Sequence, residues 1–183
     1  MNLENEEFVI KKGVLYEYKG KGGKVIIPEG VTKIDNGVFK EKNIEEVIIP
    51  NTVVEIGNFA FYENEIKYLW ISEGLSQIGD YAFYNNKIVQ LTLPQTLEGI
   101  GSNAFNCNKI KTLIIPSKVK VIKPNAFSIN EIDSVIFSEG VTDIEKDAFK
   151  FNPIKRCLVS EKVNIHDSAF DITVKKYIKQ GNK

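Results

Sequence analysis

The sequence predicts a repeat solenoid of about seven 22-residue coils, mostly β, with a parallel β-sheet along one face and short helical turns. Two observations predict this fold: phenylalanine recurs at a fixed interval, and apolar residues alternate inside each repeat. A period of this length indicates a solenoid, because each unit can bury its apolar edge only against its neighbours. The recurring residues are Phe39, Phe61, Phe83, Phe105, Phe127 and Phe149, each 22 residues after the last, and then Phe170 after 21.

One strand per coil is predicted by two apolar columns separated by a single outward residue, a spacing typical of a β-strand. Both columns are rich in β-branched residues, which agrees with a strand. A proline or serine follows the second column, and proline cannot continue a ladder, so the strand ends there. The inward columns are Val25, Val47, Leu69, Leu91, Leu113, Val135 and Cys157, and Ile27, Ile49, Ile71, Leu93, Ile115, Phe137 and Val159.

The second half of each coil carries another apolar pair, such as Val53 and Ile56, and then the Ala-Phe dipeptide. We expect this dipeptide to form a single helical turn, with the phenylalanine ring filling the centre. Three residues later stands a repeated asparagine, whose amide both donates and accepts, so it can satisfy backbone groups of its own and adjacent coils. This predicted ladder comprises Asn64, Asn86, Asn108, Asn130 and Asn152, with Lys42 at the same place in the first coil.

The two ends depart from the repeat, which predicts three segments. Residues 1–24 are expected to form an N-terminal β-hairpin cap, residues 25–170 the solenoid, and residues 171–183 a C-terminal cap or tail. Beyond Phe170 we expect the apolar residues to fold over the last coil as a short strand or helix, which would cover an open edge. Those residues are Ile172, Val174, Tyr177 and Ile178.

Composition excludes several classes of protein. A hydrophobic content of 43% and a charged content of 26% are in the globular range and exclude a disordered chain. Equal numbers of basic and acidic residues, 24 each, give no indication of a nucleic-acid partner. No apolar run reaches the roughly 18 residues of a membrane span. The first residues are polar and acidic, unlike a signal peptide, so we expect a cytoplasmic protein, or a secreted or cell-surface one whose leader has been removed.

Charge and cysteine usage add two smaller expectations. Five lysines and no acid occur between Lys109 and Lys123, which we interpret as a solvated basic face, with an acidic partner surface as the alternative. Cys107 and Cys157 fall two coils apart, a distance of about 10 Å, too far for a disulfide. Both are therefore expected to be free thiols.

The repeated columns resemble the BspA-like leucine-rich repeat family, whose units read loosely L-x-x-[LVI]-x-I-P-x-x-V-x-x-I-G-x-x-A-F. The pattern runs here from Ile44 through Pro50 to Phe61, and again from Ile88 through Pro94 to Phe105. The resemblance covers about residues 14–170. It implies a right-handed, leucine-rich-repeat-like coil and a protein-binding or adhesive role, often at bacterial or protist surfaces. It implies no catalysis.

A candidate partner site is predicted on the outward side of the strands, because residues between the inward columns must point away from the core. Tyr68 and Trp70 lie two residues apart on one strand and should stand side by side. Tyrosine, tryptophan and arginine often anchor interfaces, and an apolar stripe facing solvent is unusual for a monomer. The alternative is a β-branched ladder that only favours a flat sheet. The candidate partner-binding residues are Tyr68, Trp70, Gln90, Thr92, Thr112, Ile114, Ile136 and Arg156.

No reaction centre is visible in the sequence. His166 is the single histidine, and no Ser/His/Asp set, phosphate loop or Cys/His metal spacing occurs, so we expect no enzyme, cofactor or metal. The predicted function is a non-enzymatic, monomeric scaffold that binds a protein, such as a bacterial cell-surface adhesin. An intracellular or phage-encoded binder that inhibits a protein complex, or a purely structural spacer, are the alternatives.

Overall fold

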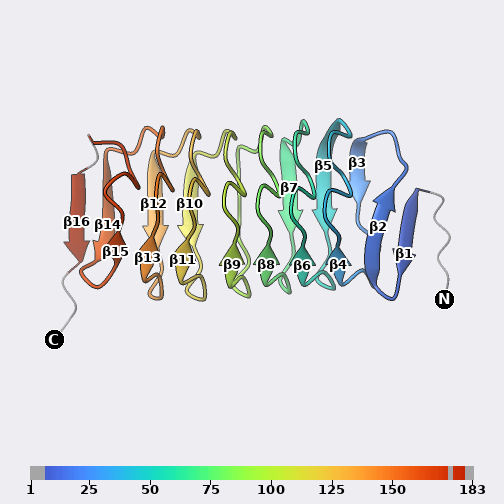
Figure 1. The fold of residues 1–183 in the computed structure, drawn as a ribbon, viewed down its shortest axis with the longest axis horizontal. Coiled ribbons are helices and arrows are strands. Elements are labelled where there is room, and N and C mark those ends of the chain that lie inside the picture. Colours follow the sequence, from blue (N-terminus) through green and yellow to red (C-terminus); the bar gives the residue numbers. More distant parts are fainter. Residues whose placement is uncertain (1–6, 173–174, 180–183) are drawn as a thin grey trace.

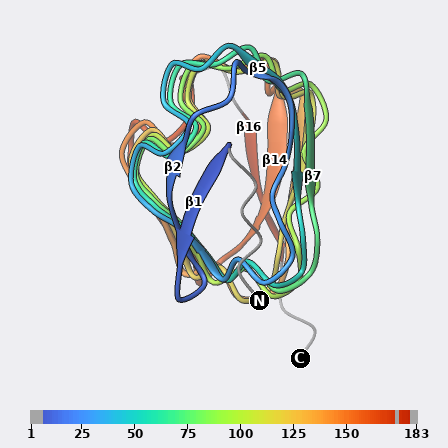
Figure 2. The ribbon, with the colours of Figure 1, turned by 90° about the vertical axis from the view of Figure 1, so that its right-hand side faces the viewer.

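The computed structural model describes residues 7–172 and 175–179, which form a β-solenoid of about seven coils stacked along one axis (Figure 1). Viewed along that axis, successive coils lie over one another in a common outline (Figure 2). Each coil contributes a two-residue strand to one side, and each coil except the fourth contributes a longer strand to the other. We call these sides the long-strand face and the short-strand face.

The strands of each face run parallel and follow one another in coil order, with one break in each face, between β7 and β10 and between β9 and β11. The long-strand face contains β3 (Gly23–Ile26), β5 (Ile44–Ile49), β7 (Tyr68–Ile71), β10 (Thr112–Ile115), β12 (Ser134–Phe137), β14 (Arg156–Ser160) and β16 (Lys175–Lys179). The short-strand face contains β4 (Lys33–Ile34), β6 (Glu55–Ile56), β8 (Gln77–Ile78), β9 (Gly99–Ile100), β11 (Val121–Ile122), β13 (Asp143–Ile144) and β15 (Asn164–Ile165).

Both ends of the stack are lined by additional strands. At the N-terminal end, β1 (Phe8–Lys11) and β2 (Val14–Tyr18) pair antiparallel, and β2 continues the short-strand face by pairing with β4. At the C-terminal end, β16 pairs parallel with β14. Residues 1–6 of the expected hairpin segment, and Val174 of the expected C-terminal cover, lie outside the described residues.

The register confirms the 22-residue period. Val47 lies opposite Leu69 and Ile48 opposite Trp70, while Ile114 lies opposite Ile136 further along the stack. Both inward columns face the interior: most of their side chains are buried, and Ile71 and Phe137 are partly buried against the core. The two cysteines are not joined, as expected: Cys107 is half-buried in a turn, and Cys157 is buried on an inward column.

The repeated phenylalanines form one continuous stack through the centre of the solenoid. Their rings are at most 4% exposed and lie nearly parallel. The centroid distances from Phe39 to Phe170 are 4.7, 5.0, 5.2, 5.5, 5.5 and 5.2 Å. This spacing is close to the strand separation of a sheet, about 4.8 Å, because each coil places one ring in the stack.

The predicted asparagine ladder is confirmed. Asn86 Oδ1 accepts a hydrogen bond from the backbone N–H of Ile66, which precedes the strand of the same coil, at 3.1 Å. Its Nδ2 donates to the carbonyls of Phe61 at 3.0 Å and Phe83 at 3.2 Å. The same arrangement recurs at Asn108, Asn130 and Asn152, and Asn64 makes the equivalent contacts with the first coil.

The expected helical turns are hydrogen-bonded turns instead, and the described residues contain no helix. In the second coil Ala60 N–H donates to Gly57 and Tyr62 N–H donates to Phe59, as in a turn. Phe59 has a φ of 58°, a left-handed conformation that a right-handed helix cannot include. Two positions per coil take this conformation: Gly37, Phe59, Tyr81, Asn103, Asn125 and Asp147, and Glu41, Glu63, Asn85, Cys107, Ile129 and Phe151.

Ile129 is the β-branched member of these columns, and its left-handed backbone costs about 1 kcal/mol or more relative to asparagine. We expect Ile129→Asn to raise the free energy of unfolding by about 1 kcal/mol in urea denaturation. The reverse exchange two coils earlier in the same column, Asn85→Ile, should lower the free energy of unfolding by a similar amount. Both side chains are exposed, so an unchanged stability in both variants would contradict the backbone explanation.

A second polar ladder, which the sequence analysis missed, joins the first four coils at the start of the phenylalanine turn. Asn36 Oδ1 accepts from Asn58 N–H at 2.7 Å, Asn58 Oδ1 from Asp80 N–H at 2.8 Å, and Asp80 Oδ1 from Ser102 N–H at 2.7 Å. Glycine precedes each of the last three residues because the coils approach closely there. A Cβ on Gly101 would lie 2.4 Å from the backbone nitrogen of Asp80.

We therefore expect Gly101→Ala to lower the free energy of unfolding by roughly 1–3 kcal/mol, since the added methyl group must displace backbone. The matched control is Gly37→Asn. A Cβ on Gly37 meets no atom within 4 Å, and asparagine already takes a positive φ at the same place in the coils of Asn103 and Asn125. Thermal melting that shifts equally in both variants would show that crowding is not the cause.

Candidate functional site

The candidate site consists of two outward rows on the long-strand face. Tyr68 and Trp70 project from β7 with 58% and 51% of their surface exposed, and Ile114 and Ile136 project from β10 and β12 at 56% and 57%. Gln90, Thr92 and Thr112 are exposed between them. Arg156 belongs to β14, but its side chain lies outside the described part of the chain.

Strand pairing brings these side chains together. Ile114 lies opposite Ile136, and Ile136 opposite Leu158, so three exposed aliphatic side chains stand in one row. Tyr68 and Trp70 stack side by side, with ring centroids 5.9 Å apart and an interplanar angle of 20°. The face thus has an aromatic part on β7 and an aliphatic part on β10, β12 and β14.

The two outward rows carry no charged residue from the third to the sixth coil. One row reads Tyr68, Gln90, Thr112 and Ser134, and the other reads Trp70, Thr92, Ile114 and Ile136. Charge begins only at Glu46, which pairs with Lys24 at 2.7 Å, and at Arg156. These eight outward residues carry no charge, whereas 26% of the residues in the whole chain are charged.

The sheet beneath this surface is not continuous. The parallel ladder stops at β7 and resumes at β10, and residues 90–93 form no strand although Leu91 and Leu93 remain buried. Gln90 and Thr92 therefore lie on an irregular segment instead of the strand that the repeat pattern predicts. Their outward direction is kept because the inward leucines fix the alternation.

A cluster of four aromatic side chains lies apart from this face, on the phenylalanine turns of the second and third coils. Tyr62 stacks on Tyr84 at 5.1 Å, and Phe59 stacks on Tyr81 at 5.0 Å. Phe59 and Tyr81 stand three residues before Tyr62 and Tyr84, so the 22-residue period brings both pairs together. A hydrogen bond to Glu63 raises the pKa of Tyr62 to about 12, so its hydroxyl stays protonated at neutral pH.

His166 lies on the short-strand face beside a shallow depression of about 340 Å³. Its Nδ1 accepts a hydrogen bond from the backbone N–H of Ser168 at 3.2 Å, and the nearby Asp143 carboxylate accepts from Asn164. Among residues 7–172 and 175–179, no three His, Cys, Asp or Glu side chains are grouped to hold a metal ion. The same residues include no helix long and apolar enough to cross a membrane.

Comparison with known families gives a match over most of the chain. The model of the BspA type leucine-rich repeat region matches residues 10–127 and 54–175, in six copies of the repeat. No curated protein matches.

Several solved structures have the same fold. A leucine-rich cell surface protein from Faecalibacterium prausnitzii superposes with a TM-score of 0.81 at 25% identity, over 92% of this chain and 52% of its own. A leucine-rich repeat protein from Bacteroides ovatus gives 0.77 at 24% identity, over 90% and 47%. The Treponema pallidum leucine-rich repeat protein gives 0.58 at 18%, over 89% and 77%. The chain spans about half the length of the first two proteins.

Proposed function

The chain belongs to the BspA-type leucine-rich repeat family, and from that premise we propose that it is a non-enzymatic scaffold that binds a protein partner through the outward rows of its long-strand face. Proteins of this family are typically interaction or surface proteins, and their fold is typically non-catalytic. A place at a bacterial cell surface is part of the proposal, supported by the description of the F. prausnitzii protein.

The observation that carries the proposal is the uncharged surface that extends from the exposed Tyr68–Trp70 pair to the sixth coil. Interface centres are depleted of charged residues and enriched in tyrosine and tryptophan, which provide large contact areas at low entropic cost. The exposed Ile114–Ile136–Leu158 row extends the apolar area along the stack. A surface that served only as a flat sheet would not need two exposed aromatic side chains side by side.

The absence of charge also defines the partner. A charged partner surface would lose hydration against these rows without gaining an opposite charge, so the complementary surface must be neutral. Binding should accordingly depend little on salt, because exposed charges dominate the salt dependence of association.

The test is a binding measurement with a purified partner, first captured from the organism's surface fraction on the immobilised wild-type protein. Trp70→Ser and Ile114→Ser should each raise Kd at least about tenfold, as expected for residues at the centre of an interface. Between 50 and 500 mM salt the Kd of the wild type should change less than about threefold.

The matched control is Phe151→Ser, since Phe151 is 61% exposed but lies on a phenylalanine turn. This variant should bind like the wild type. Loss of binding in the control with normal binding of the Trp70 variant would place the site elsewhere. Failure to capture any specific partner would favour the structural spacer.

A further inference from the structure

The coils are tied together on the short-strand face by a fixed set of backbone hydrogen bonds. Between the third and fourth coils, Glu98 N–H and Gly99 N–H donate to the Ser76 carbonyl at 2.9 and 3.0 Å, and Gly101 N–H donates to Ile78 at 2.8 Å. Between the fifth and sixth coils, Thr142 and Asp143 donate to Lys120, and Glu145 donates to Ile122.

The junction between the fourth and fifth coils lacks this set. By the repeat, Lys120 and Val121 should donate to the Glu98 carbonyl, and Lys123 to Ile100, but none of the three bonds forms in the described part of the chain. The short-strand sheet therefore ends at β9 and begins again at β11. The long-strand sheet is interrupted at the same coil, between β7 and β10.

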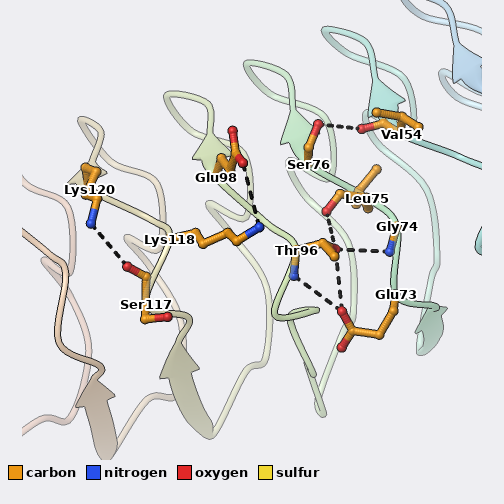
Figure 3. A network of polar contacts seen from close by, with 10 residues as sticks. All are labelled: Val54, Glu73, Gly74, Leu75, Ser76, Thr96, Glu98, Ser117, Lys118 and Lys120. Carbon is orange, nitrogen blue, oxygen red and sulfur yellow. Dashed lines mark hydrogen bonds and ion pairs between the residues drawn. The ribbon is translucent and has the colours of Figure 1, made fainter.

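Side-chain links weaken at the same place (Figure 3). The Glu73 carboxylate accepts from Thr96 N–H, and Thr96 Oγ1 accepts from Gly74 N–H and donates to Leu75, so the third and fourth coils are joined by several bonds. Across the next junction Figure 3 shows one exposed ion pair, Glu98 to Lys118, at 4.0 Å. The Asn36–Asn58–Asp80 ladder also ends at Ser102, because Pro124 has no N–H to donate.

The phenylalanine turn stays fully bonded across this junction. Asn103 N–H donates to Pro124, Phe105 N–H to Ala126 and Cys107 N–H to Ser128, at 2.9–3.1 Å. The asparagine ladder crosses it through Asn130, which accepts from Ile110 and donates to Phe105. The long-strand side keeps a backbone bond across the junction, from Lys111 N–H to the Val89 carbonyl at 3.3 Å. Most of the bonds therefore lie at the phenylalanine turn, as at a hinge with the turn as its axis.

The cause lies in two packing modes that meet here. Gly57, Gly79 and Gly101 let the first four coils approach closely, whereas Lys123, Glu145 and His166 occupy that column afterwards. The ring stack at this junction, Phe105 to Phe127, measures 5.5 Å, compared with 4.7–5.2 Å in the three stacks before it. Backbone hydrogen bonds form among the coils with glycine in this column and among the coils with larger residues there. The bonds that are missing lie where the two kinds of coil meet.

We propose that the junction between the fourth and fifth coils is a seam. The solenoid opens there about the phenylalanine turn, and the seam divides the solenoid into two cooperatively folding blocks. The first block comprises coils one to four and the second comprises coils five to seven. The seam runs beneath the long-strand face, between the aromatic part on β7 and the aliphatic part on β10 and β12. Opening would change the angle between those two parts, whether or not a partner binds there.

The first test is urea unfolding of the full chain followed by two fluorescence reporters. Trp70, the single tryptophan, reports on the first block, and the double variant Trp70→Phe/Phe137→Trp reports on the second. Two blocks should give midpoints that differ by at least about 0.5 M urea. Amide exchange at low urea should show a boundary between slow and fast segments that lies between β9 and β11.

The second test repairs the junction. The triple variant Ser102→Asp/Lys123→Gly/Pro124→Ser restores the glycine and the donor that the first four coils use, so the two midpoints should merge. Coincident transitions in the unrepaired chain, or an exchange boundary at another coil, would overturn the proposal. Midpoints that stay apart in a folded repaired chain would overturn the assigned cause.

Discussion

Replacing Phe83 by alanine is expected to lower the free energy of unfolding by about 3–5 kcal/mol. The ring is fully buried and stacks on Phe61 at 5.0 Å and on Phe105 at 5.2 Å, so no neighbour can move in without leaving its own stack. Each coil contributes one ring to the stack. Alanine at position 83 therefore leaves a cavity between the rings of Phe61 and Phe105. Urea denaturation monitored by Trp70 fluorescence would measure the loss, because Trp70 lies in the same coil as Phe83.

The matched control is Phe151→Ala, in which the same side chain is removed from a position that is 61% exposed. It should change the stability by about 0.5 kcal/mol or less, as is usual for surface substitutions. An unshifted unfolding curve for the Phe83 variant would contradict the assignment of this column to the centre of the core. Equal losses in both variants would point to the turn backbone instead of the stack.

The stack, both inward columns and the asparagine ladder were predictable because they depend on one period and on side-chain chemistry. Once residues 22 apart lie over one another, Phe61 must meet Phe83, and Asn86 must face Phe61 and Ile66. The outward direction of Trp70 and Ile114 follows from strand alternation in the same way. Their role in binding does not, because exposure alone does not identify a partner.

The turns and the seam were not predictable from residue types. Left-handed backbone is usually indicated by glycine or asparagine, but Phe59 and Ile129 adopt it here because the stacked coils above and below fix it. The fourth coil matches the repeat pattern in its inward leucines, yet its strand is missing. A hydrogen bond is lost through shifts of a fraction of an ångström, which no pattern of apolar residues encodes.

Asn108→Ala is the second substitution with a large expected effect, a loss of roughly 2–4 kcal/mol in the free energy of unfolding. Asn108 Oδ1 accepts from the buried N–H of Ile88 at 3.1 Å, and alanine leaves that donor without a partner. Its Nδ2 donates to the carbonyls of Phe83 and Phe105. These carbonyls keep Asn86 and Asn130 as donors, so the unpaired N–H and the small cavity dominate the loss.

Asn108→Asp distinguishes the contribution of the accepting oxygen of the amide from that of its donating nitrogen. It keeps the acceptor for Ile88 but places a buried carboxylate against the carbonyls of Phe83 and Phe105, which raises the pKa of the new carboxyl above its unfolded value of about 3.9. The folded state then binds the proton more tightly, so the destabilisation grows as pH rises above that value and shrinks below it. Unfolding at pH 3.5 and pH 7 should show this difference, while Asn51→Ala, at an exposed asparagine, stays near the wild type. A destabilisation of Asn108→Asp that does not depend on pH would mean that the amide's donors do not face those carbonyls.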